Sequence, residues 1–305
     1  MLASLVVLAL LAAALLAHAV LLAPRRLEAT EVEVPIADLP AALEGWTAAV
    51  VADVHQLPPL IRPQLAAAVA AVRAARPDAV LLLGDYGPSF SSTPRLTAWL
   101  YHRGMRATGD LFRALAAPDV APDGAFAVLG NHDYYLDGEV VARWLEGLGV
   151  HVLRNASVIV QRATGGAGGA GAALVIGGTD DLDGATVDPA GGCAARPDAP
   201  TIVLAHHPDS VFRLTSDRRI DLVLSGHTHG GQVVLPWYGA PLRLSRVCSR
   251  HAASGWVPNG RARLYVSRGL GGDIPLRVNC APELVFVRLT RGSGAGRVVR
   301  RWRVR

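Results

Sequence analysis

Two histidines separated by a single residue follow an apolar run in "LVLSGHTHGG", residues 222–231. An apolar run that ends in Asp, Asn or His recurs at four other places in the chain. Carboxylate and amide oxygens together with neutral imidazoles, and without thiolates, suit divalent first-row metals better than calcium. The pattern therefore predicts a metal centre built from five segment ends, which supply Asp53 and His55, Asp85, Asn131 and His132, His206 and His207, and His227 and His229.

The number of donors predicts two ions rather than one. A single tetrahedral zinc needs four ligands, whereas this set offers about seven. Asp85 is the candidate carboxylate that bridges the two ions. In the D-x-H segment 53–55 and the H-x-H segment 227–229, both side chains of an extended backbone leave the same face, because strand periodicity is two.

Alternating strands and helices must bring these segments together. Residues 46–53 are predicted to be a strand, and residues 64–85 an Ala-rich helix, a Pro-Asp break and a second strand. Further strands are predicted at 30–36, 125–130, 150–162, 172–181, 201–205 and 220–225, and further helices near 111–116 and 140–148. In an open sheet, strand ends on one edge lie side by side, so loops distant in sequence can build one pocket. The Gly-rich segment 163–172 is predicted to be a hairpin loop.

Composition limits the alternatives. With 305 residues, 51% of them hydrophobic, the chain can bury one large α/β core or two small ones. The net charge of +5 is concentrated partly in "RGSGAGRVVRRWRVR", residues 291–305, which could lie on anionic headgroups or form a solvated end. Cys193, Cys248 and Cys280 are far apart and form no C-x-x-C, which argues against disulfides and a thiolate metal site.

The first 24 residues contain no Asp, Glu, Lys or Arg and are long enough to cross a membrane as a helix. A cleaved signal peptide is the alternative, with Ala17 to Ala19 as the cleavage site, but no basic segment precedes the apolar run. Arg25 and Arg26 follow the span, so the positive-inside rule favours a cytoplasmic domain on a single-pass protein of the cytoplasmic membrane. We expect an anchor (1–24), a linker with the first strand (25–45), a catalytic domain (46–291) and a basic C-terminal tail (292–305).

The ordered set D-x-H, G-D, G-N-H-D, H-x-P and G-H-T-H, from Asp53 to His229, resembles the calcineurin-like metallophosphoesterase superfamily. Segments 226–236 and 267–289 resemble its membrane-anchored branch, which includes UDP-2,3-diacylglucosamine hydrolases and YkuE-type and YaeI-type phosphodiesterases. This resemblance implies an α/β/β/α sandwich of two mixed sheets with a binuclear centre at the sheet edge. It also implies roles for the donors: Asp53, His55 and His229 on one metal, Asn131, His206 and His227 on the other, and Asp85 between them.

Four further residues are candidates beside the metals. The resemblance places His132 unligated near the leaving group, where it could act as a general acid. Asp133 could orient His132 or cap the following helix. His207 is expected to stand near the ligands or to face substrate. Tyr86, with Phe90, Trp99, Tyr101, Tyr134 and Tyr135, could line an apolar path for acyl chains or belong to ordinary packing.

The chemistry of phosphodiester hydrolysis explains these residue types. A phosphodiester is anionic and repels hydroxide, so a catalyst must make a nucleophile near neutral pH and offset charge on the phosphoryl oxygens, which two metals can do. We expect a phosphoester or phosphodiester hydrolase with two divalent ions, Mn²⁺ first and Fe or Zn as alternatives. A lipid-linked or nucleotide-lipid pyrophosphate such as UDP-2,3-diacylglucosamine is the expected substrate, the membrane is a partner, and no nucleic-acid partner is expected. Soluble nucleotides or phosphoproteins as substrates, or a non-catalytic scaffold, are the alternatives.

Overall fold

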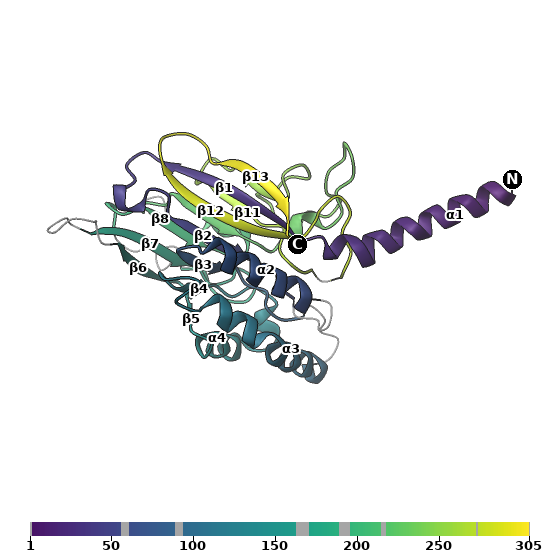
Figure 1. The fold of residues 1–305 in the computed structure, drawn as a ribbon, viewed down its shortest axis with the longest axis horizontal. Coiled ribbons are helices and arrows are strands. Elements are labelled where there is room, and N and C mark those ends of the chain that lie inside the picture. Colours follow the sequence, from purple (N-terminus) through teal and green to yellow (C-terminus); the bar gives the residue numbers. More distant parts are fainter. Residues whose placement is uncertain are drawn as a thin grey trace.

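The computed structural model describes residues 2–55, 61–88, 94–162, 171–188, 196–214, 218–272 and 274–304. Within these ranges, two mixed β-sheets pack face to face, and helices cover the outer face of one of them (Figure 1). The helices are α1 (Leu2–Ala17), α2 (Arg62–Ala75), α3 (Pro94–Leu115) and α4 (Gly138–Glu146). The strands are β1 (Glu28–Ile36), β2 (Thr47–Val51), β3 (Ala79–Leu82), β4 (Ala125–Ala127), β5 (Val150–Val152), β6 (Ala156–Arg162), β7 (Ala172–Gly178), β8 (Thr201–Leu204), β9 (Leu222–Ser225), β10 (Gly255–Val257), β11 (Leu264–Val266), β12 (Glu283–Arg291) and β13 (Arg297–Arg303).

The strand order separates the two sheets. The seven-stranded sheet runs β13-β1-β12-β2-β3-β4-β5, and the six-stranded sheet runs β10-β11-β9-β8-β7-β6. In the first sheet β2, β3, β4 and β5 are parallel neighbours, and in the second β7, β8, β9 and β11 are. The carboxyl ends of each parallel set therefore lie on one edge of its sheet.

Strand β3 shows how the sequence fills both faces of the first sheet. Val80 and Leu82 pack with the helices, whereas Leu81 and Leu83 lie between the two sheets. This alternation follows from the two-residue period of a strand, and burial on both faces explains the unbroken apolar run. Helix α2 joins the parallel strands β2 and β3, as predicted for the strand-helix-strand unit, and ends at Arg76 in a left-handed conformation.

Helix α3 is longer than the sequence pattern indicates. The prediction places a short helix near 111–116, but the structure has 22 helical residues that end at Leu115. Two threonines in the buried stripe of this helix interrupt the apolar pattern, which explains the short prediction. Buried side chains recur every three or four residues, at Thr97, Tyr101, Met105, Thr108, Phe112 and Leu115, and Gly104 is buried beside them.

In the part of the chain that the structure describes, loops and a short 3₁₀ helix, rather than long helices, cover the outer face of the six-stranded sheet. The described residues that pack there come from loops and from the short 3₁₀ helix Pro208–Phe212, and they include Leu214 and Cys248 beside Val203 and Val223. The expected sandwich of two mixed sheets is confirmed. The helices α2, α3 and α4 all pack on the outer face of the seven-stranded sheet.

The two ends of the domain meet in the first sheet. Strand β1 lies between β12, to which it is parallel, and β13, to which it is antiparallel. Residues predicted to form a basic tail therefore form an edge strand. Glutamates on β1 pair with its arginines, because Arg300 donates to Glu31 at 2.6 Å and Arg297 donates to Glu33 at 2.6 Å. Part of the positive charge of this segment is therefore offset by glutamates of the neighbouring strand.

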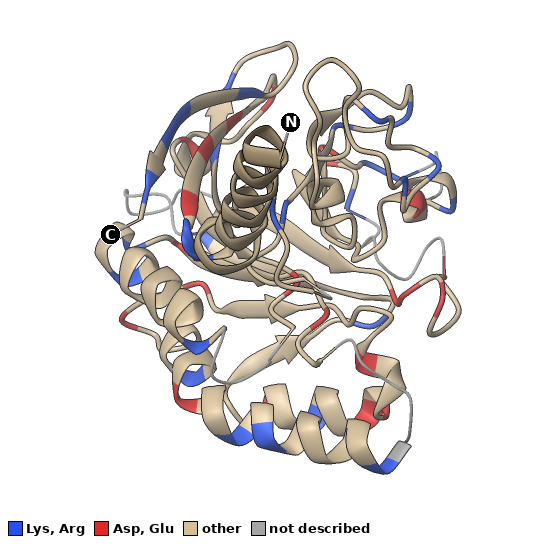
Figure 2. Ribbon diagram, turned by 90° about the vertical axis from the view of Figure 1, so that its right-hand side faces the viewer, with Lys and Arg blue, Asp and Glu red and all other residues tan. Residues whose placement is uncertain are grey.

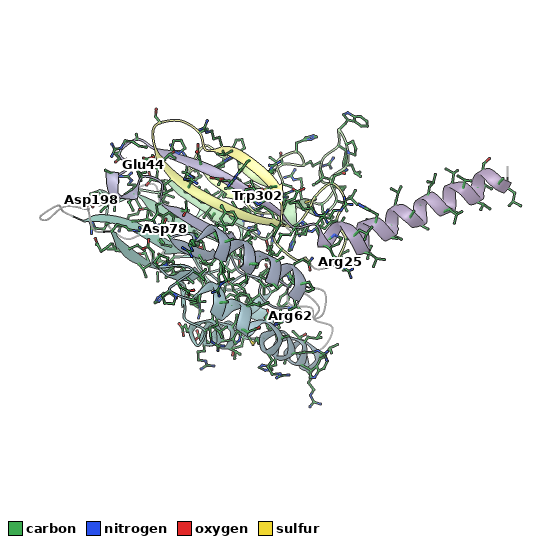
Figure 3. All side chains as sticks on the ribbon, viewed as in Figure 1. Arg25, Glu44, Arg62, Asp78, Asp198 and Trp302 are labelled. Atoms are coloured by element: carbon green, nitrogen blue, oxygen red, sulfur yellow. The ribbon has the colours of Figure 1, made fainter. Side chains whose placement is uncertain are left out.

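The N-terminal helix projects from the domain (Figure 1). Residues Leu2–Arg25 form one helical segment that is long and apolar enough to cross a membrane and is almost entirely exposed. Viewed from its N-terminus, it has no charged residue before the basic residues at its base (Figure 2). The base is attached to the domain, because the backbone N–H of Arg277 donates to the carbonyl of Ala19 at 2.9 Å. Figure 3 places Arg25 where this helix joins the domain and Asp198 at the opposite end.

Replacement of Leu81 by Ala should weaken the packing between the two sheets. Leu81 is fully buried, so we expect the free energy of unfolding to fall by about 2–5 kcal/mol. Urea unfolding of the full chain in detergent micelles measures this change. Leu242 is 64% exposed, and Leu242→Ala is the matched control, with an expected change below about 0.5 kcal/mol. Equal losses in the two variants would contradict the assignment of Leu81 to the core.

Candidate metal centre

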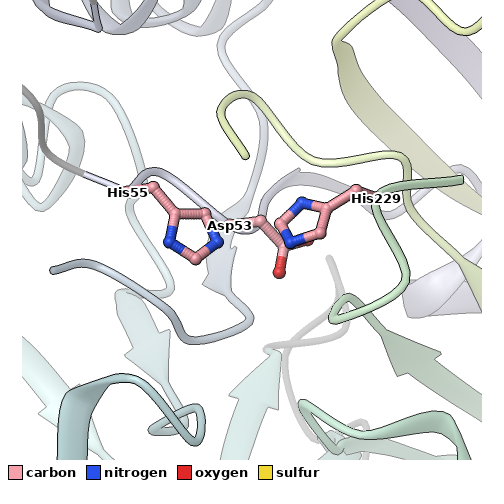
Figure 4. A group of neighbouring side chains, drawn as sticks. All are labelled: Asp53, His55 and His229. Carbon is pink, nitrogen blue, oxygen red and sulfur yellow. The ribbon is translucent and has the colours of Figure 1, made fainter. Parts of the chain in front are cut away.

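The structure brings the predicted donors to one edge shared by the two sheets. Each donor follows a strand: Asp53 and His55 follow β2, Asp85 follows β3, Asn131 follows β4, His206 follows β8, and His227 and His229 follow β9. Three of them, Asp53, His55 and His229, are drawn in Figure 4, where their side chains come together from separate segments of the chain. One donor atom from each of these three side chains lies within 4.8 Å of the other two.

A second group of donors adjoins the first. Asp53, Asp85 and His206 also offer three atoms within 4.8 Å of one another, so Asp53 belongs to both groups. Asp85, a member of the second group, also reaches the first, because its Oδ2 is 3.6 Å from Nε2 of His55 and 3.2 Å from Nε2 of His206. The sequence prediction gives the bridging position to Asp85 alone, whereas the geometry places two buried carboxylates there.

Asn131 and His227 complete the second group. The amide oxygen of Asn131 is 3.2 Å from Nε2 of His206 and 3.1 Å from Nδ1 of His227. The other ring nitrogen of His206, Nδ1, lies 2.6 Å from the carbonyl oxygen of Leu83 and donates to it. A ring that donates from Nδ1 keeps the Nε2 lone pair for a cation.

The chemistry of these donors fits divalent cations. Oδ2 of Asp53 and Nδ1 of His229 are buried and have no hydrogen-bond partner among the described residues. Burial raises the pKa of Asp53 to about 7 and lowers the pKa of His227 to about 3, and burial with the neighbouring His55 lowers the pKa of His229. A carboxylate oxygen and an imidazole nitrogen that are buried without a hydrogen-bond partner are costly unless a cation binds them.

Backbone strain is concentrated at the same residues. In the described parts of the chain, ten residues other than glycine have a positive φ, and half of them are predicted donors. A left-handed backbone is uncommon for residues other than glycine, even though Asp and His adopt it more readily than most, and it persists where surrounding structure enforces it. The five strained donors, with their φ values, are Asp53 (51°), His55 (43°), Asp85 (56°), His227 (70°) and His229 (50°).

Asp133 holds two of the donor loops together. Its carboxylate accepts backbone N–H groups from Asp85 at 2.9 Å, Tyr86 at 2.9 Å and Gly130 at 2.8 Å. The expected cap of the following helix is supplied by Asp137, whose side chain accepts from the N–H of Glu139. Burial and the nearby Asp85 charge raise the pKa of Asp133 to about 7. In this arrangement Asp133 positions the backbone of the β3 and β4 loops.

His132 and His207 flank the donors on two sides. Nε2 of His132 is 3.9 Å from Oδ2 of Asp85, and its ring meets that of His55 edge-on at 5.1 Å between centroids. The ring of His207 lies 4.1 Å from that of His227, and its Nδ1 accepts the N–H of Asp209. Both side chains therefore lie beside the donors without belonging to the two groups above.

The predicted substrate contact of Tyr86 does not fit its position. The side chain is 1% exposed, its ring packs edge-on against Phe112, and its hydroxyl donates to the carbonyl of Val128 at 2.9 Å. Tyr86 is a core residue because its side chain leaves the β3 loop toward the helices. Of the other aromatics, Tyr101 is buried as well, Trp99, Tyr134 and Tyr135 are at least partly exposed, and Phe90 lies outside the described residues.

Sequence reasoning missed Arg277 and the loop before it. Arg277 is 2% exposed, and its guanidinium donates to the carbonyls of His229 at 2.8 Å and Arg268 at 2.9 Å. In the same loop, the N–H of Gly271 donates to the carbonyl of Asp53 at 2.7 Å. Gly269 has a φ of +67°, and a Cβ there would lie 2.6 Å from Cβ of Asp53. The glycine cluster at 269–272 was the available signal of this close approach.

Cation binding should weaken as the pH falls. Since the pKa of Asp53 is about 7 in the cation-free protein, a proton occupies the carboxyl below that pH and must leave before a cation binds. His206 must also lose a proton, because Asp85 outweighs the effect of burial and raises the pKa of this imidazole. We expect the Mn²⁺ affinity to fall by at least about tenfold per pH unit below about pH 7. Calorimetric titration of the full chain measures it, and Asp53→Asn should bind weakly and with a shallower dependence. An affinity that is constant from about pH 5 to about pH 8 would contradict the account.

Comparison with known proteins identifies the family. Residues 47–231 match the model of the family described as calcineurin-like phosphoesterase. Phosphodiesterase YaeI of Escherichia coli is 31% identical over 70% of this chain and 71% of its own length. The uncharacterized metallophosphoesterase YkuE of Bacillus subtilis is 29% identical over 88% of this chain and 87% of its own. A transmembrane protein with a metallophosphoesterase domain from Danio rerio is 30% identical over 84% of this chain and 56% of its own. By the extent of these matches, the chain belongs to the calcineurin-like phosphoesterases, hydrolases of phosphoric esters.

Proposed function

We propose that this protein is a membrane-anchored phosphodiesterase with a binuclear metal centre. The observation that carries the proposal is the pair of donor groups that share Asp53, with Asp85 between them. We assign His55 and His229 to one cation, and Asn131, His206 and His227 to the other. Mn²⁺ is the first choice, with Fe or Zn as alternatives, because the donors are carboxylates, an amide and imidazoles.

We assign proton donation to His132 and positioning of the donor loops to Asp133 and Arg277. When bound, the two cations would supply the positive charge that offsets the phosphoryl oxygens and activates water. His132 donates a proton to the departing oxygen from the side of the centre next to His55. The carboxylate of Asp133 holds the loops of Asp85 and Gly130 together, because it accepts a backbone N–H from each of these two residues. Arg277 holds the carbonyl of His229 and thereby fixes the direction of that imidazole.

An arginine-lined cleft beside His207 supports a substrate with an extended anionic part. The cleft has a volume of about 840 Å³, and its wall includes Arg213, Arg243 and Arg246 as well as Asp183, Asp209 and the 44% exposed Phe212. The Asp209 carboxylate already accepts from Ser245 and from the backbone N–H groups of Arg246 and Val247. Guanidinium groups bind phosphate oxygens. The Arg261 guanidinium lies over the Phe212 ring, 5.7 Å from its centroid, so a base would stack on the other face of this ring. These features favour a nucleotide-lipid pyrophosphate such as UDP-2,3-diacylglucosamine. The cleft would also accept soluble nucleotides, which are the second candidate.

The N-terminal helix supports placement at the cytoplasmic membrane. Residues Leu2–Arg25 meet the length and composition of a span, and one relative from Danio rerio is named a transmembrane protein. Arg25 and Arg26 directly follow the span, which favours the cytoplasmic side for the catalytic domain. A phosphorylated lipid in the same membrane would then reach the domain by lateral diffusion.

Hydrolysis of a chromogenic phosphodiester tests the proposed activity. Full chain in detergent micelles should cleave bis(p-nitrophenyl) phosphate with added Mn²⁺ and lose this activity with a chelator. Absence of cleavage with any of Mn²⁺, Fe²⁺ or Zn²⁺ would favour a non-catalytic scaffold and overturn the proposal. Comparison of UDP-2,3-diacylglucosamine with UDP-N-acetylglucosamine then separates the lipid-linked substrate from the soluble one.

Two substitutions should separate proton donation from metal binding. We expect His132→Ala to lower kcat by about 10²–10⁴ with the metal content unchanged, because general acid catalysis has this range. Asp85→Ala should lower the metal content itself, because it removes a carboxylate from between the two groups. Elemental analysis alongside steady-state kinetics distinguishes the two losses. An Asp85→Ala protein with full metal content and full activity would refute the bridging role.

A further inference from the structure

A second cavity lies between the base of the N-terminal helix and the metal centre. It has a volume of about 180 Å³, and its apolar wall includes Leu21 of the helix base together with Ile61, Leu270 and Ile274 of the domain. His55 also lines this cavity. Because His55 belongs to the group with Asp53 and His229, the inner end of the cavity adjoins the donors.

The base of the N-terminal helix forms one side of the cavity. The lining includes Val20, Leu21, Pro24 and Arg25, from the last turns of the segment that is long and apolar enough to span a membrane. Leu21 is 55% exposed and Ile274 is 47% exposed, so apolar surface continues from the membrane helix to the cavity rim. Figure 3 shows Arg25, another lining residue, where the helix meets the domain.

The helix base is fixed to the wall of the cavity by hydrogen bonds. The backbone N–H of Arg277 donates to the carbonyl of Ala19 at 2.9 Å, and the amide of Gln64 donates to the carbonyl of Pro24. Both Arg277 and Gln64 line the cavity. These bonds link the membrane anchor to the residues beside the donors, so the cavity is part of the folded domain.

The polar residues of the lining are His55, Gln64, Arg277 and, at the helix base, the exposed Arg25. The Arg277 guanidinium is bonded to backbone carbonyls, including those of His229 and Arg268, so N–H groups of this side chain are satisfied within the protein. Oε1 of Gln64 is buried and has no hydrogen-bond partner among the described residues. It could accept a hydrogen bond from a hydroxyl or amide next to an alkyl chain.

We propose that this cavity binds an alkyl chain of a membrane-resident phosphodiester whose phosphate occupies the metal centre. The inference rests on the proposed function and adds where the apolar part of the substrate lies. A chain that enters between Leu21 and Ile274 stays in contact with apolar surface from the bilayer to His55. Its headgroup then points past the donors toward the arginine-lined cleft beside His207. The bilayer presents the chain, so the substrate need not leave the membrane before it is cleaved.

Alkyl p-nitrophenyl phosphate diesters provide the test. Methyl and octyl esters are compared on the full chain with Mn²⁺ in one nonionic detergent, and the measured quantity is the ratio of kcat/KM for octyl to that for methyl. Each methylene buried is worth up to about fourfold, so the ratio should exceed about tenfold in the natural protein. Ile274→Asn should lower this ratio at least about fivefold, because it places an amide at the cavity mouth.

A matched variant controls for surface and micelle effects. Ile159 on β6 is 41% exposed and does not line the cavity, so Ile159→Asn should keep the natural ratio. Equal ratios in the natural protein and Ile274→Asn, with hydrolysis of both esters intact, would overturn the cavity inference alone. A ratio near one in the natural protein would do the same. Failure to cleave either ester with any metal would instead overturn the proposed function and the inference with it.

Discussion

The arrangement of the donor loops depends on two buried carboxylates that lie close together. Asp53 and Asp85 are both excluded from solvent, and each has an oxygen within 4.8 Å of the same His206 nitrogen. Two negative charges so close and so deep are unstable without cations. Burial raises the pKa of Asp53 to about 7, whereas nearby histidines, His206 above all, overcome the effect of burial and hold the pKa of Asp85 below its usual range. Divalent cations would relieve both carboxylates at once.

The fold maintains this arrangement against backbone strain. Five donors have left-handed backbones, and hydrogen bonds from other parts of the chain hold them. Asp133 binds the N–H groups of the Asp85 loop, Arg277 binds the carbonyl of His229, and the N–H of His227 donates to Asp53 at 2.9 Å. Loops from both sheets are thus fastened to one another at the shared edge. Such preorganisation lets a site bind cations without rearranging.

The donors could be predicted because each stands directly after an apolar strand, where side-chain chemistry is unexpected unless it serves a site. Residues that act through long-range contacts could not be predicted in the same way. Tyr86 is adjacent to Asp85 in sequence, yet it turns into the core because its hydroxyl meets the carbonyl of Val128. Arg277 reaches His229 across 48 residues, and no local pattern encodes that contact.

The C-terminal boundary of the domain also depends on long-range contacts that the local sequence does not encode. Residues 297–303 resemble a basic tail when taken alone, and only the pairing with β1 places their arginines opposite Glu31 and Glu33. Helix α3 was underestimated because Thr97 and Thr108 occupy its buried stripe. Local periodicity thus predicts most of the elements, whereas the edge strand β13 depends on its pairing with β1.

The position of the donors relative to the N-terminal helix follows from the same edge. The base of the N-terminal segment is bonded to Arg277, which in turn binds the backbone of His229. The N-terminal helix is therefore connected to the donor loops through the hydrogen bonds of Arg277.

Anomalous diffraction from crystals of the full chain grown with Mn²⁺ tests the central claim most directly. The account predicts two anomalous peaks about 3.5–4 Å apart, one beside His55 and His229 and the other beside His206 and His227. A single peak, or peaks remote from Asp53, would contradict it.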